Sequence, residues 1–144
     1  MVLVLCGATT GCGDQTGAKE KLYGRVVTLP NGQKINAELV MHAADMQRGM
    51  KYRDSLAPDK GMLFVHGKEG NYPYWMHEVR IPLDIIWMNS NRVIVDFYRN
   101  AQPCLKTPDQ CPAYGGRKQA IYVLELAGGM FDKYGLQLGQ RLEF

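Results

Sequence analysis

The chain has 144 residues and a formal net charge of +3, with 46% hydrophobic and 22% charged residues. This length suffices for one domain of ordinary size, and the composition excludes a disordered chain and a coiled coil. No apolar run approaches about 18 residues, the length that a transmembrane helix needs. The mild charge, with no basic stretch interleaved with aromatic residues, argues against nucleic-acid binding.

Residues 1–20 resemble a bacterial lipoprotein signal followed by a tether. A short apolar run at 2–5 leads to a small residue directly before Cys12, whose thiol would be diacylated and in front of which everything would be removed. Thr9 departs from the usual pattern, and no basic residue precedes the apolar run, which an upstream start codon would explain. The alternative is a terminus without function. We expect Cys12 to carry the lipid, 13–20 to form a tether, and the protein to lie in the periplasm or cell envelope.

Hydrophobic patterning predicts a β-rich domain over residues 21–144. Alternation over 34–42 indicates a half-buried strand, while Met46 and Met50, at positions i and i+4, indicate a short helix over 43–50. The other expected strands cover 21–28, 62–65, 72–78, 83–88, 93–98, 120–126 and 140–144, with a turn or short helix over 128–134.

These elements predict a fold in the mainly β (α+β) class. About seven strands, one or two short helices and no alternation of strands with helices favour a compact antiparallel β-barrel or sandwich. No internal repeat or linker interrupts the expected domain, so 21–144 should fold as one unit.

Cys104 and Cys111 lie in a loop that also contains three prolines. Of the other two cysteines, Cys6 would leave with the signal and Cys12 would carry the lipid. A short cysteine pair is typical of a disulfide in an oxidising compartment, and its closure would contribute roughly 2.5 kcal/mol. Zinc is the alternative, but two cysteines with no second pair or nearby histidine make half a site. We predict a Cys104–Cys111 disulfide and no metal site.

Four blocks occur in an order that resembles the DUF192 family (domain of unknown function 192) of small bacterial and archaeal proteins. They are QRGMKYR at 47–53, GMLFV at 61–65, YWMHEVRIPLDII at 74–86 and YVLE at 122–125. The resemblance covers roughly 33–144 and implies a compact β-rich domain, often exported, without an established activity.

The chain departs from the family pattern in two of these blocks. The family usually has Phe-Trp-Met-Lys-Asn-Thr where this chain has YWMHEV at 74–79. It usually has Gly-Leu-Met where this chain has Gly49, Met50 and Lys51. A site shared by the family could therefore be altered here.

Asp84 and Glu125 are the carboxylates of greatest chemical interest, because each lies in an apolar strand and a buried carboxylate needs a partner or a raised pKa. Arg48, Arg53 and Arg80 could supply bidentate pairing. A structural ion pair is the favoured interpretation, and a ligand-binding or catalytic cleft around the same residues is the alternative.

Tryptophan side chains are core residues more often than ligand platforms, so we expect Trp75 and Trp87 to lie in the core. The methionines and histidines suit copper, yet helix and strand burial explains Met46, Met50, Met62 and Met88 as core filler. The HEVRI segment at 77–81 lacks the second histidine of a zinc-protease helix.

The absence of a complete catalytic motif favours a non-enzymatic, lipid-anchored envelope domain. Its partner would be a small ligand, a glycan or an envelope protein, without a cofactor and without nucleic acid. The candidate ligand-binding residues are Arg48, Arg53, Trp75 and Asp84. The alternative is a hydrolase acting on envelope material, with Asp84 or Glu125 as acid or base and an arginine that orients the substrate. Copper handling by methionine and histidine is a lesser alternative.

Overall fold

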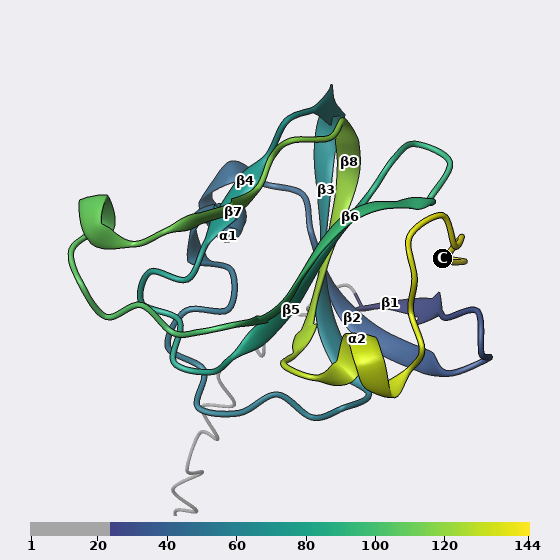
Figure 1. Cartoon of the computed structure of the whole chain (residues 1–144), viewed down its shortest axis with the longest axis horizontal. Coiled ribbons are helices and arrows are strands. Elements are labelled where there is room, and N and C mark those ends of the chain that lie inside the picture. The colour runs from purple at the N-terminus through teal and green to yellow at the C-terminus, as the bar shows by residue number, and fades with distance from the viewer. Residues whose placement is uncertain (1–23) are drawn as a thin grey trace, which may run out of the picture.

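The computed structural model describes residues 24–144, so the expected signal, tether and acylated Cys12 lie outside the described residues. Six strands form one sheet in the order β1-β2-β3-β8-β5-β6, and β4 pairs with β7 in a small second sheet (Figure 1). In chain order the elements are β1 (Gly24–Thr28), β2 (Lys34–Val40), α1 (Ala43–Arg48), β3 (Lys60–Gly70), β4 (Pro73–Trp75), β5 (Leu83–Met88), β6 (Ile94–Ala101), the 3-10 helix η1 (Pro108–Gln110), β7 (Ala113–Gly115), β8 (Ala120–Ala127) and α2 (Met130–Lys133).

The mainly β class with short helices is confirmed, and its layered arrangement is compatible with a sandwich. The sheet does not close into a barrel. Residues 140–144 form only isolated bridges, in which Glu143 pairs with Thr28 and Arg141 with Val93, instead of the expected last strand. No helix in the described part of the chain is long and apolar enough to cross a membrane.

β2 and β3 run parallel, with α1 between them. The expectation of no strand–helix alternation is therefore wrong at this one place. A parallel pair requires a crossover connection of about a dozen residues or more, and 41–59 supplies it. Most of this connection is not helical. The hydrophobic pattern of the segment therefore did not indicate a helix long enough to suggest a crossover.

Successive strand residues point to opposite faces of the large sheet, and other parts of the chain cover each face. The first face carries Leu124 and Leu126 of β8 and is covered by side chains from α2 and the C-terminal tail. The second face carries Val123 and is covered by the α1 segment, the region of β4 and β7, and the cysteine loop. Figure 1 shows these two coverings on opposite sides of the large sheet.

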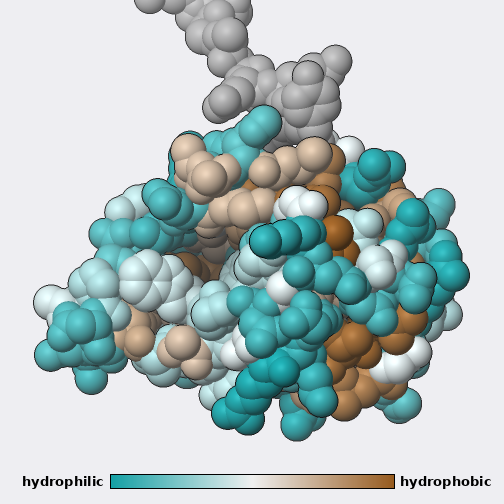
Figure 2. All heavy atoms as spheres, turned by 90° about the horizontal axis from the view of Figure 1, so that it is seen from above, coloured by the Kyte–Doolittle hydropathy of each residue, from teal (hydrophilic) through white to brown (hydrophobic). Residues whose placement is uncertain are grey.

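The predicted disulfide is confirmed, with the Cα atoms of Cys104 and Cys111 5.8 Å apart, inside the range that a disulfide requires. Its loop connects β6 to β7 and contains η1. The loop projects at the left of Figures 1 and 2, where its surface is mostly hydrophilic. Backbone bonds from Cys104 N–H to the Met76 carbonyl (3.1 Å) and from Glu78 N–H to the Cys104 carbonyl (3.1 Å) join it to residues after β4.

Because the disulfide loop lies outside the six-stranded sheet, its loss should loosen the loop without unfolding the domain. Cys104→Ser/Cys111→Ser is expected to lower the free energy of unfolding by about 1–3 kcal/mol. Urea denaturation followed by tryptophan fluorescence measures this loss, and circular dichroism reports whether the strands persist. A variant with no cooperative unfolding transition would contradict the prediction.

Candidate ligand-binding site

A cavity of about 40 Å³ lies on the second face of the sheet, beside α1 and β4. Its lining combines buried apolar side chains with polar and charged groups that reach the surface. The apolar and aromatic members are Met46, Met50, Phe64, Tyr74, Trp75 and Val79, and the polar and charged ones are Gln47, Arg48, Lys51, His77 and Glu125.

Glu125 is the most deeply buried polar group of the cavity, with 4% of its surface exposed. It lies on β8 between Met62 of β3 and Ile85 of β5, so it has apolar neighbours on both sides. Burial raises its pKa to about 8, an effect that the charge of Arg53 only partly opposes. At neutral pH the carboxyl group is therefore mostly protonated and can donate as well as accept a hydrogen bond.

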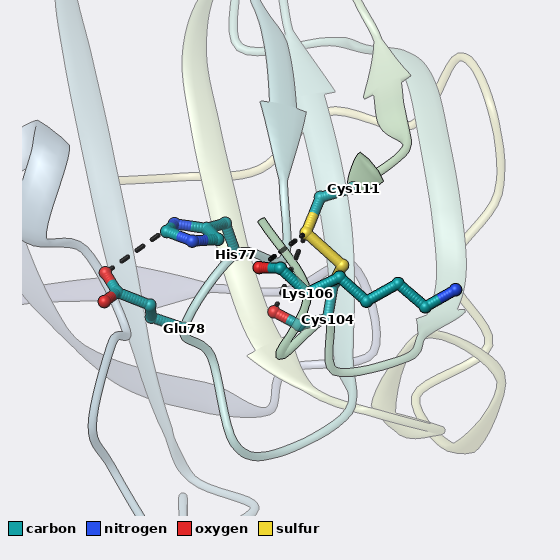
Figure 3. Close-up of a disulfide and its surroundings, with 5 residues drawn as sticks. All are labelled: His77, Glu78, Cys104, Lys106 and Cys111. Carbon is teal, nitrogen blue, oxygen red and sulfur yellow. Dashed lines mark hydrogen bonds and ion pairs between the residues drawn. A yellow bond between two sulfur atoms is a disulfide. The ribbon is translucent and has the colours of Figure 1, made fainter. Parts of the chain in front are cut away.

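His77 contributes the second buried polar atom of the cavity. Within residues 24–144, only His77 Nδ1 and Glu125 Oε2 are buried side-chain N or O atoms without a hydrogen-bond partner. Glu78 Oε2 lies 3.6 Å from His77 Nδ1 (Figure 3), an ion-pair distance that is too long for a hydrogen bond. Both unpartnered atoms thus belong to residues that line the same cavity.

Trp75 supplies an exposed aromatic surface beside the cavity. Trp75 is the last residue of β4, and its side chain is 44% exposed. The expectation that it belongs to the core is therefore wrong. The His77 ring lies 5.1 Å from the Trp75 ring, and Lys51 Nζ lies 5.9 Å from it, within range of a cation–π interaction. Trp87 does lie in the core, at 1% exposure.

Two residues that directly follow cavity-lining residues in the chain, Tyr52 after Lys51 and Glu78 after His77, have a backbone conformation that side chains rarely adopt. Tyr52 and Glu78 have φ values of 64° and 61°, and Tyr52 N–H donates to the Glu78 carbonyl over 3.2 Å. Lys51 Nζ lies 3.1 Å from Glu78 Oε2, and hydrogen bonds from Lys51 and Tyr52 lower the Glu78 pKa. Such strained positions gather at functional sites, and here both are next in the chain to residues that line the cavity.

Of the residues that the sequence nominated, Arg48, Trp75 and Glu125 line this cavity and Arg53 and Asp84 do not. Arg53 forms a bidentate ion pair with Glu38, with N–O distances of 2.5 and 2.6 Å. It lines a separate hollow of about 400 Å³.

Asp84 lies fully buried on the first face of the sheet, opposite to Glu125. Its Cα partner on β8 is Leu126, a residue of the first-face core. Its carboxylate accepts hydrogen bonds from the backbone N–H groups of Asn100 (2.7 Å) and Phe131 (2.6 Å). The expected ion pair of Asp84 or Glu125 with an arginine is wrong, because neither carboxylate pairs with one.

The rim residues that sequence reasoning missed are Lys51 and His77. A signal for them existed, because Lys51, His77 and Glu78 are among the departures from the family pattern noted above. The structure brings these three residues together beside the cavity, where Lys51 pairs with Glu78. Two unusual residues in separate blocks could have suggested this contact.

The methionines are divided among different parts of the fold. Met46 and Met50 line the cavity with His77, whereas Met62 and Met76 pack in the second-face core and Met88 in the first-face core. Within the described residues, no three His, Cys, Asp or Glu side chains are grouped as metal ligands would be.

Comparison with known proteins adds a family and two structural neighbours. The DUF192 family model, described as "Uncharacterized ACR", matches residues 26–144. A Sinorhizobium meliloti protein described as a candidate transcription regulator has 30% identity and a TM-score of 0.73, over 82% of this chain and 89% of its own. A Novosphingobium aromaticivorans protein of unknown function has 25% identity and a TM-score of 0.78, over 96% and 100%. No curated protein matches the chain significantly.

Proposed function

This chain belongs to the DUF192 family, described as uncharacterized, and we propose that it is a non-enzymatic envelope module that binds a small ligand in the Glu125 cavity. One observation carries the proposal. The two buried side-chain atoms without hydrogen-bond partners in the described fold, on Glu125 and His77, belong to residues lining one cavity. An unsatisfied buried polar atom costs about 1–3 kcal/mol, and a polar ligand group that reached both atoms would offset that cost.

The rest of the site suits recognition of a ligand that is larger than the cavity. Known small-molecule pockets enclose about 300–1,000 Å³, whereas this cavity measures about 40 Å³. Only one polar group of a ligand fits inside, and the remainder would lie on the surface against Trp75. A glycan or another small ligand with a compact polar group meets this description.

Binding can be tested by protein-observed ¹H–¹⁵N NMR with a panel of glycan fragments, small carboxylic acids and amines. We expect at least one compound to perturb the amide signals of His77 and Glu125. His77→Ala should weaken that binding about tenfold, the effect of losing one hydrogen bond of roughly 1.4 kcal/mol. The matched control is Arg99→Ala, which removes an exposed ion pair to Asp132 and should leave binding unchanged. A panel without any cavity perturbation would contradict the binding function.

A hydrolase is the second candidate, favoured by the raised Glu125 pKa of about 8. A general acid works best when its pKa is near the operating pH, and His77 and Arg48 line the same cavity. Asp84 has no part in this alternative, because it is buried on the opposite face. Turnover of envelope glycans or peptides that Glu125→Gln abolishes would favour the enzyme over the binding module.

Copper handling has less support from the site. Met46, Met50 and His77 line one cavity, but so do the cationic side chains of Arg48 and Lys51. Their charges oppose a bound metal cation.

The proposed location rests on Cys12 and on the Cys104–Cys111 disulfide, which supports an oxidising compartment. We expect a fatty-acid probe fed to cells to label the native protein through Cys12. Cys12→Ala should lose the label, and the control Cys6→Ala should keep it. Equal labelling of the Cys12→Ala variant and the native protein would exclude this anchor.

A further inference from the structure

The charged groups of the Glu125 cavity determine which kind of ligand it favours. Arg48 and Lys51 are the cationic side chains of its lining. Lys51 is balanced by Glu78, 3.1 Å away, whereas Arg48 has no ion-pair partner within residues 24–144. Glu125 adds little negative charge at neutral pH because it is mostly protonated. The lining is therefore net positive and favours an anion.

The size of the cavity restricts that anion. At about 40 Å³, it is far smaller than the roughly 300–1,000 Å³ of pockets that enclose a whole small ligand, so only a compact anionic group can enter it. A carboxylate is planar and more compact than a phosphate, and a sugar or aromatic ring would remain outside. Of these groups, a carboxylate suits the cavity best.

The hydrogen-bonding groups of the cavity match a carboxylate as well. The protonated Glu125 carboxyl group can donate to a carboxylate oxygen, and such O–H···O⁻ bonds are short and strong. The His77 ring can also donate from Nδ1 in one tautomer or when protonated, and this atom has no other hydrogen-bond partner in the described fold. The two acceptor oxygens of a carboxylate could satisfy both groups.

From this charge, size and hydrogen bonding we infer that the ligand is a carboxylic acid, whose carboxylate enters the cavity while its body lies against Trp75. The inference rests on the proposed binding function and specifies its ligand class. Trp75 suits the second part because its indole is both exposed and adjacent to the cavity. An aromatic or aliphatic body could be buried against that surface.

Binding of a carboxylate in this site should depend on the proton of Glu125. The other charged or titratable groups around this carboxyl are Arg53, its ion-pair partner Glu38, Tyr74, His77, Arg48 and Lys51. Its strand neighbours Met62 and Ile85 carry no charge. When Glu125 ionises, the donor is lost and two negative charges meet in a small cavity. Affinity should therefore fall as the pH rises through about 8.

The test compares benzoate with two benzene derivatives of similar size, neutral benzamide and cationic benzylamine, on the full chain of residues 1–144. Trp75 indole N–H and His77 amide shifts in ¹H–¹⁵N NMR report binding at the site. We expect benzoate to bind at least tenfold more tightly than either probe at pH 6.5, and to lose at least tenfold in affinity by pH 9. Glu125→Gln, whose amide donates at every pH, should bind benzoate with little change over this range.

Preferential binding of benzylamine or benzamide would overturn the carboxylate inference and leave the binding function standing. The same holds if glycan fragments bind in the cavity and benzoate does not. A fall in affinity above pH 8 that persists in Glu125→Gln would overturn the role of the Glu125 proton. Arg99→Ala is the control in each titration, because its side chain pairs with Asp132 and does not line the cavity.

Discussion

Replacing Asp84 with alanine is expected to lower the free energy of unfolding by about 3–5 kcal/mol. The carboxylate is fully buried and accepts hydrogen bonds from Asn100 N–H and Phe131 N–H, at 2.7 and 2.6 Å. Alanine would leave both backbone donors without their acceptor and would create a cavity. Asp84 fixes the end of β6 and the start of α2 to β5, so its loss should weaken the first-face core as well.

Urea denaturation of Asp84→Ala measures this effect, and Asp132→Ala is the matched control. Asp132 pairs with Arg99 at the surface, so its loss should cost less than about 1 kcal/mol. Asp84→Asn should lie between the two, because its amide oxygen can serve one N–H while its NH₂ group opposes the other. If Asp84→Ala does not fold, Asp84→Asn still gives a measurable value. A loss below about 1 kcal/mol in both variants would contradict the role given to Asp84.

Hydrophobic patterning was sufficient to predict most of the large sheet. The expected strands over 34–42, 83–88 and 120–126 coincide closely with β2, β5 and β8. The pairing of strands was not predictable in the same way, because it depends on contacts between distant segments. Two pairings depend on such distant contacts. They are the parallel pairing of β2 with β3 and the bridges that residues 140–144 form.

Asp84 and Glu125 show the same limit of sequence-based prediction for single residues, because their relative positions depend on strand pairing. Apolar neighbours predicted that Asp84 and Glu125 are buried, and both are. Their separation depends on the register between β5 and β8, in which Glu125 is opposite Ile85 and Asp84 is opposite Leu126. Since a shift of one residue exchanges the two faces of a strand, sequence alone could not decide whether they share a site.

The cavity was predictable only in part. Arg48, Trp75 and Glu125 were nominated as chemically interesting, but Trp75 was expected in the core. It is exposed because β4 belongs to the short two-stranded sheet and Trp75 is its last residue. His77 was considered only as a metal ligand, for zinc and for copper, and its place in the cavity depends on the backbone bonds between Met76, Glu78 and Cys104.

Glu125 should make the native protein less stable as the pH rises between about 4.5 and 8. Burial raises the pKa of its carboxyl from the ordinary value of 4.5 to about 8 in the native state. Between these values the unfolded chain has released the proton that the native state still holds. Raising the pH therefore favours unfolding, by about 1.4 kcal/mol per pH unit.

The full contribution of Glu125 is present below about pH 4.5 and is lost as the pH rises through about 8, where the native carboxyl also ionises. The accumulated loss is roughly 4–5 kcal/mol. Other carboxylates change stability in the opposite direction, as Glu78 does through its lowered pKa. The difference between native protein and a Glu125 variant isolates the one group, because these other contributions are common to both.

Glu125→Gln is the informative variant, because glutamine has nearly the same shape and never ionises. Its free energy of unfolding should be within about 1 kcal/mol of the native value at pH 4, where Glu125 is protonated in both states. At pH 8 it should exceed the native value by several kcal/mol, and the difference should stop growing above that pH. Urea denaturation at intervals between pH 4 and 9 measures the curve. A difference that stays constant across this range would show that Glu125 ionises normally, and would remove the proton donor on which carboxylate binding depends.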